Sequence, residues 1–424
     1  MTKNEIASVA MERGGGILRL APVWVPRTFC RPGKRIKLHP ADYYEYGAAR
    51  GAIDERWLSS TTPADNGPGT LEDEGLSYVI VGDGGGGAGA GARGAGAGAG
   101  GGAMRILLKD AIDELKGQII GDMLWGKYGR WPMYSKFFDN LGPLPHHIHH
   151  SEEHANLVGM HGKPEMYFFP AQMNNHPGEF AYTFFGLNPG VTKAQLRDAL
   201  MKFTKGDNGI VELARAYKLT LDTGWDVPTG VLHAPGSLCT YEPQYSSDVF
   251  AMYQSVLFGE HVVPGDLLWK NCPQDKIGDY DYLVEMVDWD INTDPDFVEN
   301  RFMQPVAING GAGGAGDGAQ GYLEEWICYK SPLASAKRLT VAPGQKVIVR
   351  DTAAYGAIVL QGHGRMGAWD VETPTLIRFS ELTLDEFFVS EGAAKAGVEI
   401  ENRSSVEPLV MLKHFSENPD LPTG

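Results

Sequence analysis

Residues 144–169 read LPHHIHHSEEHANLVGMHGKPEMYFF and contain half of the 12 histidines in this 424-residue chain. His147 and His149 are two positions apart, so on a β-strand both imidazoles would lie on the same face. Glu165 follows sixteen positions after His149, a distance that suits a neighbouring strand returning beside the first. Two imidazoles and a carboxylate on one face of a sheet would form the core of a metal site.

A fourth candidate ligand lies in GWDVPTGVLHAPGS, residues 224–237, where His233 follows a Pro-Thr-Gly turn. Alone, an H-x-H pair is a weak signal, because two histidines on a strand are more often exposed or hydrogen-bonded. The combination of H-x-H, G-K-P-E and P-T-G-x-x-H-A is much more specific. Three neutral imidazoles and one carboxylate suit a divalent transition metal with positions left open for water or substrate. We therefore predict four metal ligands: His147, His149, Glu165 and His233.

The other histidines of this stretch are expected to be solvated or to support the site rather than to bind metal. His146 and His150 would face the opposite side of a regular strand. His154 follows two glutamates and is expected to begin a polar turn. For His161 we expect a position near the mouth of the site.

Composition narrows the function classes. The net charge of -16 and the pI of about 5.2 argue against nucleic-acid binding, which needs basic patches. The N-terminus shows no secretory signal, and no window of about 18 apolar residues predicts a membrane span. The four cysteines are far apart and are expected to be reduced thiols. A cytoplasmic location is the default expectation.

Short β-branched or aromatic segments, bounded by Gly, Pro, Asn or Asp, cluster at about 135–260 and 335–415. This spacing is typical of jelly-roll barrels, and two blocks indicate two barrels. Helices are expected at 104–124 and at 192–203, with Thr192 as N-cap. The glycine-rich runs at 82–102 and 309–321 lack selected glycine positions and a G-K-[ST] motif, so we expect flexible surface loops rather than phosphate sites.

Four segments resemble the cupin superfamily, and within it the zinc-dependent (type I) mannose-6-phosphate isomerase family. They are WPMYSKFFDNLGPLPHHIHHSEEHA (131–155), GKPE (162–165), VPTGVLHA (227–234) and YEPQYSSDVFAMY (241–253). The resemblance covers roughly residues 120–260 well and extends weakly over the rest. It implies a mainly β fold with some helix: two cupin (jelly-roll) barrels with helical insertions.

The resemblance also assigns roles. The metal ligands are again His147, His149, Glu165 and His233, although the family usually has glutamine at the position of His147. The set of three histidines and one glutamate is common among cupins. Zinc is therefore the leading candidate for the metal ion, and iron, manganese or nickel are alternatives. Lys136 matches a substrate-site lysine, Glu242 a glutamate on the active-site wall, and Lys163 a lysine beside the metal-binding glutamate. Met252 stands where the family has an arginine.

The C-terminal block resembles a cupin barrel that has lost its metal site. VLQGHGRMGAWD (359–370) has only His363, and residues 394–397 stand where a second histidine would be expected. We therefore expect a degenerate barrel that packs against the first. The chain would divide into four parts: an N-terminal segment with a Gly-rich loop contributing to the first barrel (1–103), a metal-binding barrel with helical insertions (104–305), a Gly-rich linker (306–334) and the degenerate second barrel (335–424).

The function implied by the resemblance is metal-dependent aldose–ketose isomerisation of a sugar or sugar phosphate through a cis-enediol. Glu242 would act as base or acid, and Lys136 and Lys163 would hold hydroxyls, phosphate or the enediolate. Glu242 and Lys136 could instead be exposed strand residues. Another metal cupin enzyme, such as an epimerase or an iron dioxygenase, and a non-catalytic sugar-binding cupin, which Met252 favours, stay open as alternatives. The expected partner is a small sugar, and oligomerisation is left open.

Overall fold

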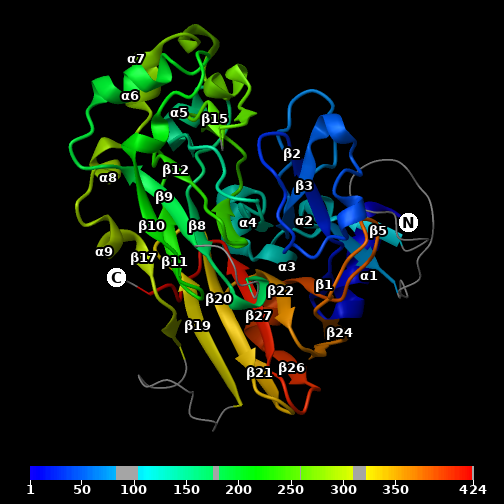
Figure 1. The fold of residues 1–424 in the computed structure, drawn as a ribbon. Coiled ribbons are helices and arrows are strands. Elements are labelled where there is room, and N and C mark those ends of the chain that lie inside the picture. The colour runs from blue at the N-terminus through cyan, green and yellow to red at the C-terminus, as the bar shows by residue number, and fades with distance from the viewer. Residues whose placement is uncertain (83–103, 175–180, 258, 309–320, 423–424) are drawn as a thin grey trace.

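The structure is a computed structural model that describes residues 1–82, 104–174, 181–257, 259–308 and 321–422. Its centre consists of two pairs of facing antiparallel sheets, with helices around them (Figure 1). The predicted fold class, mainly β with two barrels and helical insertions, is confirmed. No helix within the described ranges has both the length and the apolar character needed to cross a membrane.

The first barrel consists of a seven-stranded and a five-stranded sheet. The larger sheet has the order β17 (Phe302–Met303), β11 (Gly224–Val227), β8 (Glu165–Phe168), β13 (Thr240–Tyr245), β6 (Met133–Phe138), β3 (Ala52–Leu58) and β2 (Val23–Arg27). The smaller has the order β10 (Ala214–Lys218), β9 (Tyr182–Leu187), β12 (His233–Ala234), β7 (His147–Ile148) and β14 (Ala251–Met252). Phe138 of β6 and Phe185 of β9 belong to one buried cluster, so the two sheets enclose a common core.

The second barrel repeats this arrangement with C-terminal strands and one N-terminal strand. Its seven-stranded sheet has the order β1 (Ile17–Arg19), β25 (Glu386–Val389), β22 (Tyr355–Gln361), β27 (Leu409–Phe415), β20 (Ser335–Val341), β19 (Tyr322–Cys328) and β18 (Val306–Ala307). Its four-stranded sheet has the order β21 (Lys346–Val349), β26 (Val398–Asn402), β23 (His363–Met366) and β24 (Trp369–Glu372). Met411 and Ile400 share its buried core.

The two seven-stranded sheets pack back to back. On β13, Tyr241 lies in the same buried cluster as Leu412 of β27, whereas the next residue, Glu242, points to the other side, into the first barrel. The second barrel therefore supports, through this buried face, the wall that carries Glu242. The division into four parts remains a prediction; within 306–334, β18 and β19 pair in the sheet of the second barrel.

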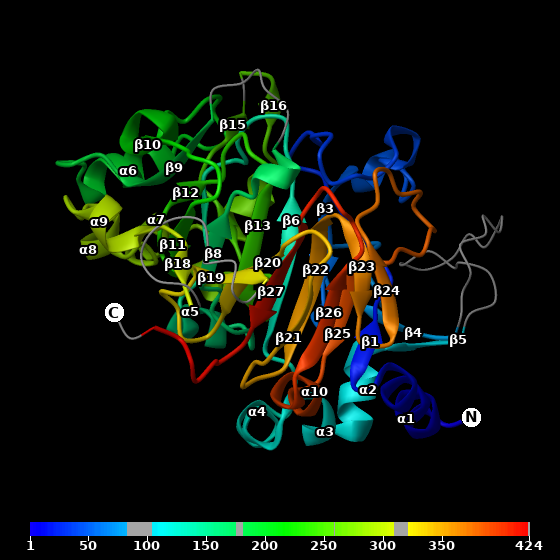
Figure 2. The same ribbon diagram turned by 90° about the horizontal axis from the view of Figure 1, so that it is seen from below.

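Helices lie at two places. Figure 2 shows α1 (Lys3–Gly14), α2 (Leu108–Leu115), α3 (Gly117–Ile120), α4 (Asp122–Tyr128) and α10 (Glu391–Ala396) along one edge of the second barrel. In Figure 1, α5 (Glu152–Asn156), α6 (Lys193–Leu200), α7 (Tyr280–Glu285), α8 (Trp289–Asn292) and α9 (Phe297–Arg301) lie on the side of the five-stranded sheet. Short 3-10 helices cover Pro40–Asp42, Ala48–Arg50, Ala171–Met173, Ile210–Leu213, Gly265–Trp269 and Gln274–Lys276.

The helix predicted at 192–203 corresponds to α6, whereas the one predicted at 104–124 begins later than expected. Thr192 caps α6 with a capping box that includes Gln195, as residue types at these positions favour. The helix predicted from residue 104 begins only at Leu108, because Met104–Leu107 form β5 and pair with β4 (Tyr78–Val81). A further small sheet joins β15 (Val256–Leu257) and β16 (His261–Val262).

The segment 375–382, which has a strand-like composition, forms only an isolated bridge at Ile377. Nε of the following residue, Arg378, lies 2.6 Å from Oδ2 of Asp42 in the N-terminal region. This segment is therefore held by contacts with a loop and not by pairing in a sheet. The two glycine-rich runs lie almost wholly outside the described residues, and the prediction of flexible loops there remains a prediction.

Candidate metal centre

Three predicted ligands meet inside the first barrel. Side-chain nitrogens of His147, His149 and His233 all lie within 4.8 Å of one another, and all three residues are buried. His147 starts β7 and is the direct cross-strand partner of His233 on β12, which explains how residues far apart in sequence meet. The imidazole centroids of His147 and His149 are 5.0 Å apart, so the two rings share one side as the spacing predicts.

Each imidazole is oriented by a backbone carbonyl. The Nδ1 contacts are His147 to Pro145 (2.7 Å), His149 to Val249 (2.7 Å) and His233 to Val231 (2.8 Å). A carbonyl oxygen only accepts hydrogen bonds, so Nδ1 is the protonated nitrogen and Nε2 carries a lone pair. Burial lowers the pKa of His149 to about 3 and that of His147 well below its usual range. These two rings are therefore neutral near pH 7, as metal ligands must be.

Glu165 on β8 contacts the triad through both carboxylate oxygens. Oε2 lies 3.0 Å from Nε2 of His149, and Oε1 lies 3.1 Å from Nε2 of His233. The Tyr167 hydroxyl donates a hydrogen bond to Oε1. Burial opposes ionisation, but the surrounding groups, including the Lys163 ammonium 2.9 Å away, outweigh it and hold the pKa of Glu165 well below its usual range. Glu165 is thus a carboxylate at the edge of the triad.

The donor set fits a divalent metal. Nε2 of His233 is buried without a hydrogen-bond partner and lies 3.1 Å from Oε1 of Glu165. Two acceptor atoms at this distance repel each other, and a cation beside them would remove that repulsion. Three imidazole nitrogens with a carboxylate are a set that zinc and related transition metals use. The residues present are therefore suited to hold a metal ion.

Two lysines and Glu242 form the wall beside the triad. Glu242 Oε1 lies 3.3 Å from Nζ of Lys136 and 3.4 Å from Nζ of Lys163. Register pairs Glu242 on β13 with Lys136 on β6, which brings these side chains together. Burial, and then the nearby Glu165 carboxylate, raise the pKa of Glu242 to about 8 against the opposing lysines. Glu242 is 2% and Lys136 5% exposed, so neither is the exposed strand residue that the sequence left open.

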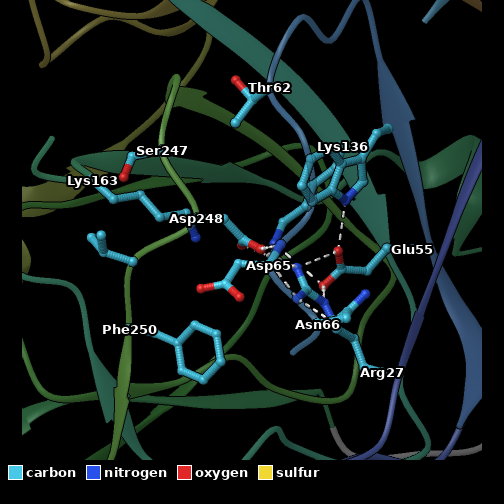
Figure 3. Close-up of polar contacts among 12 residues, drawn as sticks. Arg27, Glu55, Thr62, Asp65, Asn66, Lys136, Lys163, Ser247, Asp248 and Phe250 are labelled. Carbon is cyan, nitrogen blue, oxygen red and sulfur yellow. Dashed lines mark hydrogen bonds and ion pairs between the residues drawn. The ribbon is translucent and has the colours of Figure 1, made fainter. Parts of the chain in front are cut away.

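Sequence reasoning missed a second layer of charge, on β2 and β3. Arg27 Nε lies 3.1 Å from Glu55 Oε1, and its Nη2 lies 3.1 Å from Asp248 Oδ1 (Figure 3). Glu55 Oε1 in turn lies 3.5 Å from Nζ of Lys136. Burial opposes ionisation of Glu55, but Arg27 and Lys136 lower its pKa to about 2. The available signal was the four charged residues inside the otherwise apolar runs VWVPR and AIDERWL, since buried charges need partners.

Met252 lies where the register places it, next to the metal centre. On β14 it is the cross-strand partner of His147, and its side chain is buried in an apolar cluster with Ile148. A thioether carries no charge and only weakly accepts hydrogen bonds, so this position gives the site no cation.

The flanking histidines do not join the triad within the described chain. A solvated position is wrong for His146 and His150, which are 1% and 0% exposed, because helical insertions cover the outer side of β7. His146 lies 2.7 Å from the Gln254 side chain. His154 lies within the short helix α5, and His161 is exposed beside Glu152.

In the second barrel the described residues contain no group of this kind. His363 is exposed at the start of β23, and Ala394 is buried within α10.

These features define a two-barrel cupin architecture with a candidate metal centre in the first barrel. The fold is that of the mannose-6-phosphate isomerases. The mannose 6-phosphate isomerase of Bacillus subtilis superposes with a TM-score of 0.55 and 16% identity, covering 94% of this chain and 99% of that one. A variant of the phosphomannose isomerase of Salmonella typhimurium superposes with a TM-score of 0.59 and 10% identity, covering 95% of this chain and 100% of that one.

A zinc-bound mannose 6-phosphate isomerase gives a TM-score of 0.58 and 12% identity over 95% of this chain and 100% of that one. No protein-family model and no curated protein matches the sequence. At these identities the similarity establishes the fold.

Proposed function

We propose that this protein is a metal-dependent aldose–ketose isomerase that acts on a sugar or sugar phosphate. The observation that carries the proposal is the position of Glu242. This buried carboxylate lies on the barrel wall beside the histidine triad and is held between two lysine ammonium groups. A barrel interior with a metal centre and an adjacent acid/base is what proton transfer next to a carbonyl requires.

His147, His149, Glu165 and His233 would hold the metal, with zinc as the leading candidate and iron, manganese or nickel as alternatives. When bound, such an ion polarises a carbonyl and the neighbouring hydroxyl and offsets negative charge that develops on oxygen. The carbonyl contacts of the three Nδ1 atoms would keep the Nε2 lone pairs directed to the ion.

The chain's own residues would move the protons. Glu242, as carboxylate, would take the proton from C2 of an aldose and later return it to C1, with the cis-enediol between the two steps. A second proton would pass in sum from the O2 hydroxyl to O1, so that the ketose forms with no proton gained or lost overall. Lys136 and Lys163 lie within 3.4 Å of Glu242 and would orient it and donate hydrogen bonds to substrate oxygens.

The test is metal analysis of the purified protein followed by NMR of hexoses, pentoses and their phosphates in deuterated water. We expect about one metal ion per chain, and metal-dependent incorporation of deuterium at the carbon next to the carbonyl. Binding of a sugar without exchange would contradict isomerase activity and support the non-catalytic sugar-binding alternative, which Met252 favours.

A second candidate function rests on the ligand set. Three histidines and one glutamate also suit the metal centre of other cupin enzymes, including an epimerase or a ferrous dioxygenase. Oxygen consumption by the iron-loaded protein separates a dioxygenase from an isomerase, because aldose–ketose isomerisation uses no oxidant.

A further inference from the structure

The cations on the wall of the proposed site are already neutralised by the protein. Arg27 lies between Glu55 and Asp248, each 3.1 Å away. Lys136 lies between Glu55 and Glu242 at 3.5 and 3.3 Å. The guanidinium of Arg27 also donates a hydrogen bond to Oδ1 of Asn66 at 2.8 Å. Its N–H groups are therefore used by three side chains of the protein: Glu55, Asp248 and Asn66.

The same holds for the two other cations of this wall. Lys163 Nζ lies 2.9 Å from Glu165 Oε2 and 3.4 Å from Glu242 Oε1. Lys270 Nζ lies 2.8 Å from Asp65 Oδ1, at the more exposed side, where the Asp65 side chain is 35% exposed. Figure 3 shows Lys163, Asp65 and Asp248 around a common space, with Glu55 and Arg27 beyond them.

Three of these cations have carboxylate partners that are not metal ligands. Arg27 faces Glu55 and Asp248, Lys136 faces Glu55, and Lys270 faces Asp65, whereas Lys163 faces the proposed metal ligand Glu165. A phosphate dianion is recognised by cations and N–H donors that are free to turn toward it. Here it would have to displace carboxylates from buried cations and would be repelled by those carboxylates.

Carboxylates instead suit a neutral polyol. The Asp65 side chain, which is 35% exposed, can accept hydrogen bonds from a ligand, and every hydroxyl of a sugar is a donor. Met252, the cross-strand partner of His147, is an uncharged buried residue and gives this part of the barrel no cation. We infer that the substrate is an unphosphorylated aldose or ketose, an inference that rests on the proposed isomerase function and narrows its substrate class.

Arg130 is the cation that tests this inference most directly. Its Nη1 donates a hydrogen bond to the Ser246 hydroxyl at 3.0 Å, and the guanidinium lies 5.5 Å from the centre of the Tyr245 ring. Its other acceptors are the Ser246 carbonyl and the Tyr245 hydroxyl. These partners carry no charge, so Arg130 is the cation near this wall that a phosphate group could use. If the substrate is neutral, Arg130 has no part in substrate choice.

The experiment compares D-mannose and D-fructose with their 6-phosphates, using the zinc-loaded protein. Deuterium exchange next to the carbonyl gives kcat/KM, and calorimetry gives Kd for each sugar. We expect at least a ten-fold preference for the neutral sugars in both measurements and no competition by inorganic phosphate at equal concentration. Equal or better use of the phosphates would overturn the substrate class but leave the isomerase function standing. If none of the four shows exchange, the comparison moves to the pair of neutral and phosphorylated sugars that the wider screen of hexoses and pentoses identifies; exchange with no sugar of that screen would remove the isomerase function and this inference together.

Three variants sharpen the result. Asp65→Asn releases the Lys270 ammonium at the exposed side and should reduce the preference for neutral sugars several-fold by improving binding of the phosphates. Asp370→Asn removes an equivalent surface partner of Arg403 on the second barrel and should leave the preference unchanged. Arg130→Gln should also leave it unchanged. A selective loss of phosphate-ester turnover in Arg130→Gln would show a phosphate site and overturn the inference.

Discussion

Nε2 of His149 lies 3.0 Å from Oε2 of Glu165, and neither atom brings a proton to the contact. His149 uses its Nδ1 proton at the Val249 carbonyl, and burial keeps the ring neutral with a pKa of about 3. Two lone pairs at this distance repel unless a cation lies beside them. The Lys163 ammonium is that cation here, 3.1 Å from the imidazole and 2.9 Å from the carboxylate. A bound metal would compete with this lysine for the same lone pairs.

Replacement of Glu165 is therefore expected to weaken metal binding. Glu165→Gln removes the negative charge, and the affinity for zinc should fall at least 100-fold. Supporting residues of metal sites already contribute about 10–100-fold. Competition with a chromophoric chelator measures the affinity. His161→Asn is the matched control, because His161 lies in the same histidine-rich stretch but is exposed beside Glu152. Equal losses in both variants would contradict the ligand assignment.

The ligand motif could be predicted from sequence because its geometry is local. Strand alternation places His147 and His149 on one side. The resemblance identifies His233 as the third histidine ligand, and the pairing of β12 with β7 brings it next to His147. The rest of the site could not be found in this way. Arg27 and Asp248 are 221 positions apart, and their contact depends on how β2 and the segment after β13 are placed by the whole barrel.

Burial was likewise hard to predict at His146 and His150. Strand alternation correctly removes them from the metal side, but it does not say whether the opposite face meets water. The helical insertions decide that point, by covering this face with an apolar cluster that includes Leu196 of α6 and Leu283 of α7.

Glu242→Gln should abolish most of the proposed activity while the metal stays bound. General acid–base groups typically contribute about 10²–10⁴-fold to the rate, and glutamine keeps the shape but cannot carry the proton. Deuterium exchange and metal content are measured on the same sample. Retained exchange would show that another group moves the proton, and loss of metal would show that Glu242 acts through the metal centre instead.

Arg27 should be important for stability through the charges it neutralises. Arg27→Met leaves Glu55 and Asp248 buried without their counter-ion, and breaking a buried pair in this way costs about 3–5 kcal/mol. Denaturant unfolding measures the loss. Adding Asp248→Asn to the variant removes one of the two buried carboxylates that lost their counter-ion and should recover part of the stability. A double variant no better than Arg27→Met would contradict this electrostatic account.

The second barrel should contribute nothing to metal content. His363→Ala removes the histidine of its cupin-like motif, which is exposed at the start of β23. Metal stoichiometry and affinity are expected to equal those of the wild type, whereas His233→Ala should lose the metal. A drop in stoichiometry in His363→Ala would reveal a second site.

His414 should make stability depend on pH. It is fully buried where β27 of the second barrel meets the first barrel, and the Tyr241 hydroxyl lies 3.0 Å from its Nδ1. Burial lowers its pKa from 6.5 to about 3. The unfolded chain therefore binds a proton more readily than the folded one. The stabilisation is complete above pH 6.5 and is lost as the pH falls toward 3.

Each pH unit below 6.5 should remove up to about 1.4 kcal/mol of the free energy of unfolding through this one group. His414→Asn keeps an acceptor near the Tyr241 hydroxyl but does not titrate in this range. It should be less stable than the wild type at pH 8, and the gap should narrow as the pH falls to 5. Denaturant titrations of both proteins at several pH values measure the gap. The other buried histidines are present in both proteins and cancel in the comparison, so parallel curves would mean that His414 is not protonated on unfolding in this range.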